Sequence, residues 1–133
     1  MPESRRGRVF AEEVESHFGF LRARFGFEGP RAEPYALVFL RPDLKVEVMR
    51  DSRTQDVFTL LWRRRTPQDP AREADRPSWS RGWDREDLEE VAAELLPSGT
   101  AAHSVSGRTR YAMNRSLAQQ AEVLTRLLEL LVT

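Results

Sequence analysis

The sequence predicts an α+β fold, in which an N-terminal helix precedes a three-stranded antiparallel meander and two C-terminal helices follow a long loop. Three short runs of β-forming residues lie between residues 35 and 63, separated by compact turns. Apolar residues at helical spacing occur before and after these runs. A chain of 133 residues falls within the usual size of one domain, so we expect a single domain over residues 1–133.

The N-terminal helix is predicted over residues 7–25. Its apolar residues recur at helical spacing: Phe10, Val14, Phe18, Leu21 and Phe25. Gly26 is well placed to end this helix, because glycine adopts the left-handed conformation of a helix C-terminus without steric penalty. Residues 28–34 contain two prolines, which stop the helix from continuing, and they are predicted to form a loop.

The meander is predicted to contain strands over residues 35–40, 44–50 and 57–62. The Arg-Pro-Asp turn between the first two follows from the fixed backbone of proline and the capping carboxylate of Asp. Residues 44–50 alternate apolar and polar, which is typical of a strand with one solvated face. Residues 57–62 are apolar on both faces, so we expect a helix of this chain or a partner to cover the second face.

The segment 63–83 is rich in arginine, proline and tryptophan, and it is predicted to be a long, mobile surface loop. A helix over residues 85–96 follows, with Asp84 as its N-cap, and the last helix covers residues 109–131. The end of the last helix is apolar most of the way round, so it is either buried on several sides or in contact with a second copy. The candidates for self-association in a homodimer are Leu124, Leu127, Leu128 and Leu131.

Composition excludes several classes of protein. The formal net charge is zero, so no global field attracts nucleic acid or anionic lipid. The chain has no cysteine, which excludes disulfides and thiolate chemistry. The N-terminus lacks the apolar run of a signal peptide, and the apolar tail Val123–Val132 is too short to span a bilayer. We therefore expect a cytoplasmic bacterial protein with no membrane partner, whose arginine excess reflects a GC-rich genome.

No motif predicts catalysis, a metal or a cofactor. His17 and His103 are far apart and lie in no ligand-spaced motif. Ser104 and Ser106 flank His103 without an evident third orienting group, and no glycine-rich phosphate loop occurs. The carboxylates of the predicted hairpins lie on turns or on the wetter strand face, where a solvated role is expected. The sequence therefore predicts a protein that is not an enzyme and needs no cofactor.

Charge is segregated around the predicted loop. Arginines outnumber acidic residues over residues 63–81, whereas acidic residues dominate residues 84–94. Three interpretations stay open: the loop neutralises its own acidic helix, binds a protein, or binds nucleic acid through Arg63–Arg81. The candidate residues for partner binding are Trp79, Arg81, Trp83, Asp87, Glu90 and Glu94.

One resemblance adds to these inferences. Residues 18–27 read Phe-x-Phe-Leu-x3-Phe-Gly-Phe, and residues 46–57 read Val-x-Val-x2-Asp-x-Arg-Thr-x-Asp-Val. This pattern resembles small uncharacterised bacterial proteins whose size and layout are similar to the immunity-type α+β proteins of bacterial conflict systems. The resemblance covers residues 10–63 and implies a fold and a bacterial cytosolic setting, but no catalytic residue. The segment 63–83 departs from it.

Three functional hypotheses follow, and the third is the least supported. The first is a non-enzymatic protein-interaction module, immunity-like or a small subunit of a larger assembly. The alternative is a nucleic-acid-binding accessory protein that uses Arg63–Arg81. The third is an enzyme with an unrecognised pair of carboxylates.

Overall fold

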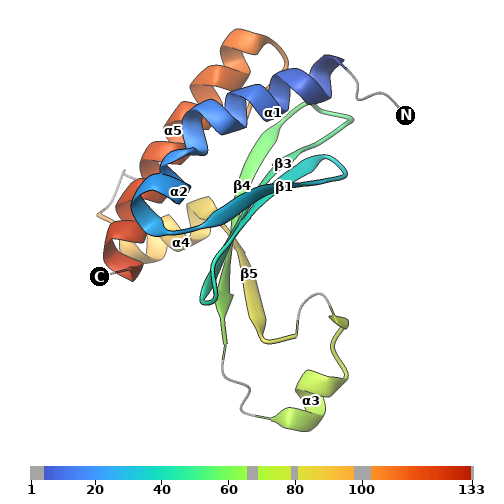
Figure 1. Cartoon of the computed structure of the whole chain (residues 1–133), viewed down its shortest axis with the longest axis vertical. Coiled ribbons are helices and arrows are strands. Elements are labelled where there is room, and N and C mark those ends of the chain that lie inside the picture. Colours follow the sequence, from blue (N-terminus) through green and yellow to red (C-terminus); the bar gives the residue numbers. More distant parts are fainter. Residues whose placement is uncertain (1–4, 66–68, 79–80, 98–102, 133) are drawn as a thin grey trace.

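The fold is α+β, with one antiparallel sheet and helices packed against one of its faces (Figure 1). The computed structural model describes residues 5–65, 69–78, 81–97 and 103–132. Within these residues the sheet has five strands in the order β1-β2-β3-β4-β5. The elements are α1 (Arg5–Phe18), α2 (Phe20–Phe25), β1 (Glu28–Glu33), β2 (Ala36–Leu40), β3 (Leu44–Arg50), β4 (Val57–Arg64), α3 (Pro70–Ala74), β5 (Trp83–Asp87), α4 (Leu88–Leu95) and α5 (Arg110–Leu131).

The predicted N-terminal helix is divided in two. It begins at Arg5 rather than residue 7, and it is interrupted at Gly19, between α1 and α2. Glycine is a weak helix former, and the Gly19 carbonyl accepts a 3.2 Å bond from the amide of Arg22, which tightens the turn there. Gly26 ends α2 as predicted, with φ of 71° and its N–H bonded to the Leu21 carbonyl.

The sheet has two strands more than the meander predicted from the sequence. Residues 28–33, predicted as a loop, form edge strand β1 and pair with β2. Proline in this segment made it resemble a loop in the sequence. Proline is nevertheless compatible with an edge strand, because no partner strand requires its amide there. Strand β3 has the predicted bounds, and β2 starts at Ala36 because Tyr35 has a positive φ of 58° in the preceding turn.

The second addition is β5, which corrects two predictions about residues 63–96. Strand β4 continues to Arg64, and β5 pairs with it where the loop and the start of a helix were expected. Asp84 lies within β5, and the N-cap of α4 is Asp87, whose carboxylate accepts a 2.9 Å bond from the Glu89 amide. The acidic residues of this segment indicated the first turn of a helix, because acidic side chains are favoured there. The segment pairs with β4 instead, so the helix begins three residues later than predicted.

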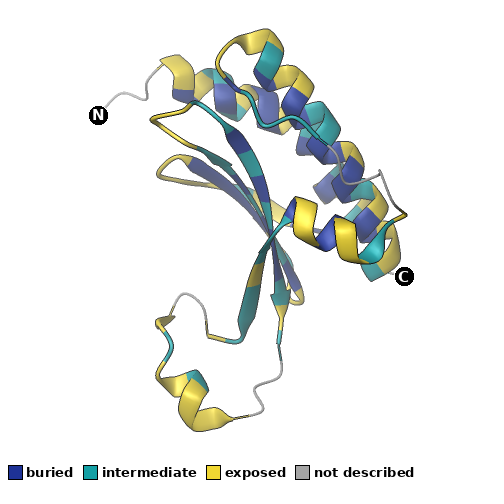
Figure 2. Ribbon diagram, turned by 180° about the vertical axis from the view of Figure 1, so that it is seen from behind, coloured by how far each residue is buried: buried dark blue, intermediate teal, exposed yellow. Residues whose placement is uncertain are grey.

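The described residues between β4 and β5 (65, 69–78 and 81–82), here called the extension, include helix α3, which lies beyond the end of the sheet (Figure 1). Asp69 caps α3 by accepting bonds from the amides of Ala71 and Arg72. No residue of α3 is buried (Figure 2). The predicted loop thus contains a helix and the ends of two strands.

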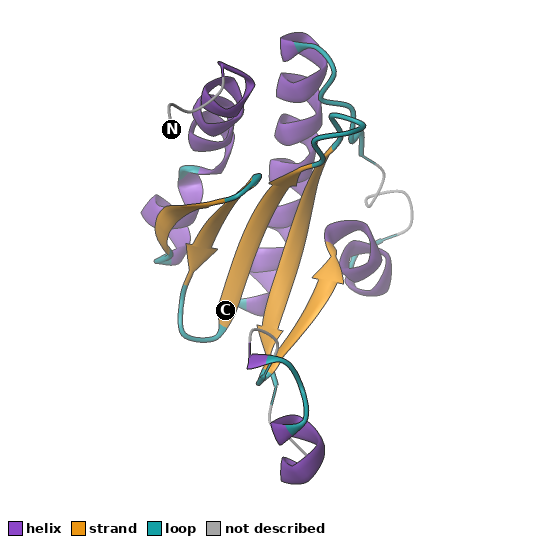
Figure 3. Ribbon diagram, turned by 90° about the vertical axis from the view of Figure 1, so that its right-hand side faces the viewer, coloured by secondary structure: helices purple, strands orange, loops and turns teal. Residues whose placement is uncertain are grey.

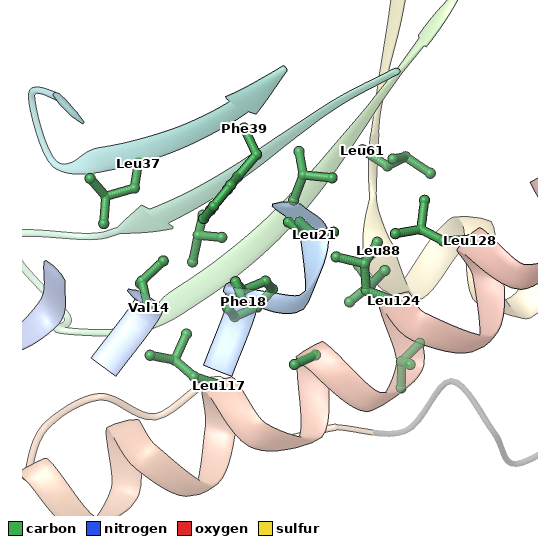
Figure 4. Packing of buried hydrophobic residues seen from close by; sticks show 14 of the residues in the cluster. Val14, Phe18, Leu21, Leu37, Phe39, Leu61, Leu88, Leu117, Leu124 and Leu128 are labelled. Carbon is green, nitrogen blue, oxygen red and sulfur yellow. The ribbon is translucent and has the colours of Figure 1, made fainter. Parts of the chain in front are cut away.

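The core lies between the inner face of the sheet and the helices α1, α2, α4 and α5. Figure 4 shows Phe18 and Leu21 beneath Phe39 of β2, with Leu124 and Leu128 of α5 beside Leu88 of α4. Helix α5 begins after Thr109, which caps it through a 3.0 Å bond from the Ala112 amide. None of the described helices is long and apolar enough to cross a membrane.

Candidate interaction face

The sheet has one face that no described helix covers, here called the open face (Figures 2 and 3). Residues opposite each other on antiparallel strands point to the same side of a sheet, so the register identifies its members. Lys45 pairs with Trp62 and Trp62 with Arg85, which places all three on one face. Alternation along β2 to β5 then assigns the open face as Ala36, Val38, Leu40, Lys45, Glu47, Met49, Phe58, Leu60, Trp62, Arg64, Trp83, Arg85 and Asp87.

An apolar strip lies toward the end of the open face that is opposite Lys45 and Trp62. Met49, Phe58 and Leu60 are half-buried there, whereas Leu40, which is 38% exposed, pairs with Lys45 at the other end. The sequence predicted that the second face of β4 would be covered, and in the described part of the chain no helix covers it. Next to the strip is a shallow depression of ≈ 590 Å³, lined by Val38, Lys45, Glu47, Trp62 and Arg85 among others.

Cations and tryptophans alternate at one end of the open face. The Lys45 ammonium lies 4.5 Å from the Trp62 ring centroid and 5.0 Å from that of Trp83. The Arg85 guanidinium lies 5.4 Å from the ring centroid of Trp62, and the Arg64 guanidinium lies 4.5 Å from the ring centroid of Trp83. We call these five residues the Trp62–Trp83 cluster. Each contact of this kind is worth about 0.5–1 kcal/mol at an exposed site and more where water is excluded.

The electrostatics of the cluster centre on Lys45. Burial lowers the pKa of Lys45 from its ordinary value, and the nearby guanidinium groups of Arg31 and Arg64 lower it further, while Glu47 opposes them. The Glu47 carboxylate accepts a 3.0 Å hydrogen bond from the Trp62 indole, which fixes the orientation of that ring. The cluster is therefore a preorganised cationic and aromatic surface, and preorganised surfaces lose less entropy on binding.

The candidates for partner binding do not form one surface. Trp83 belongs to the open face, whereas Arg81 donates 2.8 Å hydrogen bonds to the carbonyls of Arg76 and Ala74 within the extension. Asp87 is occupied in capping α4. Glu90 and Glu94 are exposed on α4, in the helical layer. Trp79 lies outside the described residues.

Two arginines of the candidate nucleic-acid segment, Arg63 and Arg65, form ion pairs with carboxylates of this chain. Arg63 pairs with Glu86 of β5. Arg65 pairs with Glu73 of the extension and, at 2.6 Å, with Asp84. Glu73 also accepts a hydrogen bond from the Gly82 amide, which, with Arg65, lowers the pKa of its carboxyl. These contacts correspond to the interpretation in which the segment neutralises charge within the chain, although chiefly against β5 rather than a helix.

The leucines proposed for self-association belong to the core. Leu124, Leu127 and Leu128 are fully buried against the sheet and the other helices, and Leu131 is half-buried at the edge of the core. Leu124, Leu127 and Leu128 therefore offer no surface to a second copy while the monomer is folded. Of the two alternatives for this helix end, burial on several sides is the one observed.

The sequence missed Lys45, Trp62, Arg64 and Arg85. The period-two pattern of residues 83–87 could have predicted a strand there. As a strand paired with β4, that segment places Trp83 and Arg85 beside Arg64 and Trp62. Its acidic content instead indicated a helix start.

One group of side chains could approach a metal ion. Asp87, Glu89 and His103 each place one oxygen or nitrogen atom within 4.8 Å of the others. Such donors suit a divalent cation. However, the Asp87 carboxylate already caps α4, and the positive end of a helix dipole disfavours a cation at that position.

Comparisons with known proteins returned no family model, no curated protein and no solved structure that matches this chain.

Proposed function

We propose that the chain is a non-enzymatic protein-interaction module that binds a partner on the open face of its sheet. The observation that carries this proposal is the Trp62–Trp83 cluster, which adjoins the half-buried apolar strip on a face that none of the described helices covers. Tryptophan and arginine are enriched among the residues that dominate binding energy at protein interfaces. An apolar strip bordered by such residues matches the usual anatomy of an interface.

The chemistry of the cluster favours an acidic, partly apolar segment of the partner protein. Lys45, Arg64 and Arg85 present their charges between the rings, and Glu47 is already hydrogen-bonded to the Trp62 indole. A carboxylate that approaches the cluster meets three cations while an adjacent apolar side chain meets Leu60 or Met49. Complementary charges of this kind give specificity and increase the association rate.

The alternative, nucleic-acid binding, has less support from the geometry. A base stacks on the face of an aromatic ring, but cations already contact Trp62 and Trp83, and Trp62 is only 5% exposed. Two of the arginines in the segment Arg63–Arg81 that the alternative uses, Arg63 and Arg65, are paired with carboxylates. Binding to phosphates would have to break these ion pairs.

The proposed setting is the bacterial cytosol and the proposed class is immunity-like, in line with the resemblance of residues 10–63. A small subunit of a larger assembly is the other form that the proposed module could take. Self-association through α5 is not included, because three of the four leucines that suggested it are fully buried.

The test uses a fluorescein-labelled peptide that alternates glutamate with leucine, and a labelled single-stranded oligonucleotide as the competing class. Fluorescence anisotropy at low salt should detect binding of the peptide and none of the oligonucleotide. Lys45→Glu should weaken peptide binding by about tenfold or more, because it reverses the central charge of the cluster.

Arg126→Glu is the matched control, since it makes the same kind of charge reversal on the exposed surface of α5. It should leave the affinity for the peptide unchanged. Equal losses in both variants, or no peptide binding at low salt, would reject the proposal. Preferential binding of the oligonucleotide would favour the nucleic-acid alternative instead.

A further inference from the structure

A second concave site lies away from the open face, where the N-terminal ends of α1 and α5 meet the turn between β3 and β4 (Figure 1). It is a cavity of ≈ 320 Å³. Arg5 and Arg6 of α1 line one side, and Arg108 and Arg110 line the other. Val9 and Met113 provide apolar contacts between them.

The charge of this cavity is not balanced by its own lining. Among the described residues, its lining includes four arginines and no carboxylate. Arg110 pairs with Glu12 at 3.4 Å and with Glu13 at 3.1 Å, so its charge is partly compensated. For Arg5, Arg6 and Arg108, the described part of the chain offers no hydrogen bond or ion pair, whereas Arg63 and Arg65 have carboxylate partners.

The two helix ends increase the positive potential. Helix α5 has 22 residues and starts at Arg110, and neither α1 nor α5 has an acidic residue in its first turn. The N-terminus of a helix carries a partial positive charge, so arginines there repel it and acidic residues are the stabilising choice. A cluster of arginines at two such ends opposes folding stability, and a bound anion would relieve the repulsion.

We infer that this cavity binds a small anion with two or more linked phosphate groups. The planar guanidinium fork matches the geometry of phosphate oxygens and can bind them in a bidentate manner, and phosphates also bind well at helix N-termini. A diphosphate can reach arginines on both sides of the cavity at once, which a single carboxylate cannot. The cavity is concave and limited in size, so it suits a small ligand better than a nucleic-acid backbone.

Isothermal titration calorimetry at low salt tests the inference with two probes, pyrophosphate and ADP. Both should bind if the linked phosphates are what the cavity recognises, and tighter binding of ADP would identify a nucleotide as the source. Arg108→Gln should weaken the binding of either probe by roughly tenfold, as expected for the loss of a charge-assisted contact. The double variant with Arg5→Gln and Arg6→Gln should weaken it at least as much.

Arg115→Gln is the matched control, because Arg115 is exposed on α5 and does not line the cavity. It should bind the probes as the unmodified chain does, and so should Lys45→Glu, which separates this site from the proposed protein-binding face. Unchanged circular dichroism would show that each variant is folded. No binding of either probe, or equal weakening by Arg108→Gln and Arg115→Gln, would overturn the inference.

Discussion

The ammonium group of Lys45 lies 4.5 Å from the ring centroid of Trp62, its direct partner across the ladder of β3 and β4. The same ammonium reaches Trp83 of β5, so one side chain spans three strands. This arrangement depends on the register, because a shift by one residue would move Lys45 to the core face. The register of the sheet therefore determines whether Lys45 takes part in the Trp62–Trp83 cluster.

The lowered pKa of Lys45 gives a prediction about pH. A folded-state pKa below the ordinary value of 10.5 means that the unfolded chain binds more protons between these two pH values. The free energy of unfolding contributed by Lys45 should therefore rise as pH increases through that interval. Lys45→Met should remove this rise, as measured by urea denaturation at several pH values. Parallel profiles for the two proteins would contradict the prediction.

Gln120 gives a prediction about stability. It is fully buried on α5, accepts a 2.8 Å hydrogen bond from the Thr59 hydroxyl, and donates 2.9 Å bonds to the carbonyls of Val57 and Ser104. Gln120→Leu should lower the free energy of unfolding by about 1–3 kcal/mol, because it leaves buried polar groups without a partner. Adding Thr59→Val should recover part of the loss, since it removes one orphaned hydroxyl. A double variant that is less stable than the single one would contradict this reasoning.

The leucines of α5 give a prediction that separates burial from self-association. Leu127 is fully buried and Leu130 is 55% exposed on the same helix. Leu127→Glu should cost about 3 kcal/mol or more, since it loses apolar packing and buries a charge. Leu130→Glu should change stability little. If Leu127→Glu were as stable as the unmodified chain and changed only the mass seen by light scattering, the leucine would be at an interface after all.

The extension gives a prediction about local order. The Gly82 amide donates a hydrogen bond to Glu73, and Arg65 pairs with the same carboxylate, so the pKa of Glu73 is held below its ordinary value. Glu73→Gln should increase hydrogen exchange at the Gly82 amide near neutral pH, whereas Glu90→Gln, at an exposed position of α4, should not. This difference should vanish as pH falls through the lowered pKa of Glu73, because the carboxylate contribution is lost there. A difference that persists at lower pH would exclude the charge as its cause.

Elements with a clear local pattern could be predicted from the sequence. Strand β3 alternates strictly, and α5 combines a Thr109 cap with a long apolar stripe. Gly26 ended α2 where its left-handed conformation was expected. In these places residue propensity, apolar periodicity and capping residues all indicate the same element, so the element can be predicted from the sequence.

Elements that depend on pairing could not be predicted. Strands β1 and β5 carry proline or many charges, and β4 stabilises β5 by partners distant in sequence. The site was missed for the same reason, because Trp62 and Trp83 share one face only when residues 83–87 are a strand. Gln120 interrupted the apolar stripe of α5, and its three hydrogen bonds explain why a polar residue is placed there.

The most direct test of the open face is to map the bound glutamate–leucine peptide by nuclear magnetic resonance. If the peptide binds on the open face, chemical shifts should change at the indole signals of Trp62 and Trp83 and along β3 to β5. Signals on the outer surface of α5, such as that of Tyr111, should stay unchanged. Shifts confined to the helical layer, with both indole signals unmoved at saturating peptide, would contradict binding on the open face.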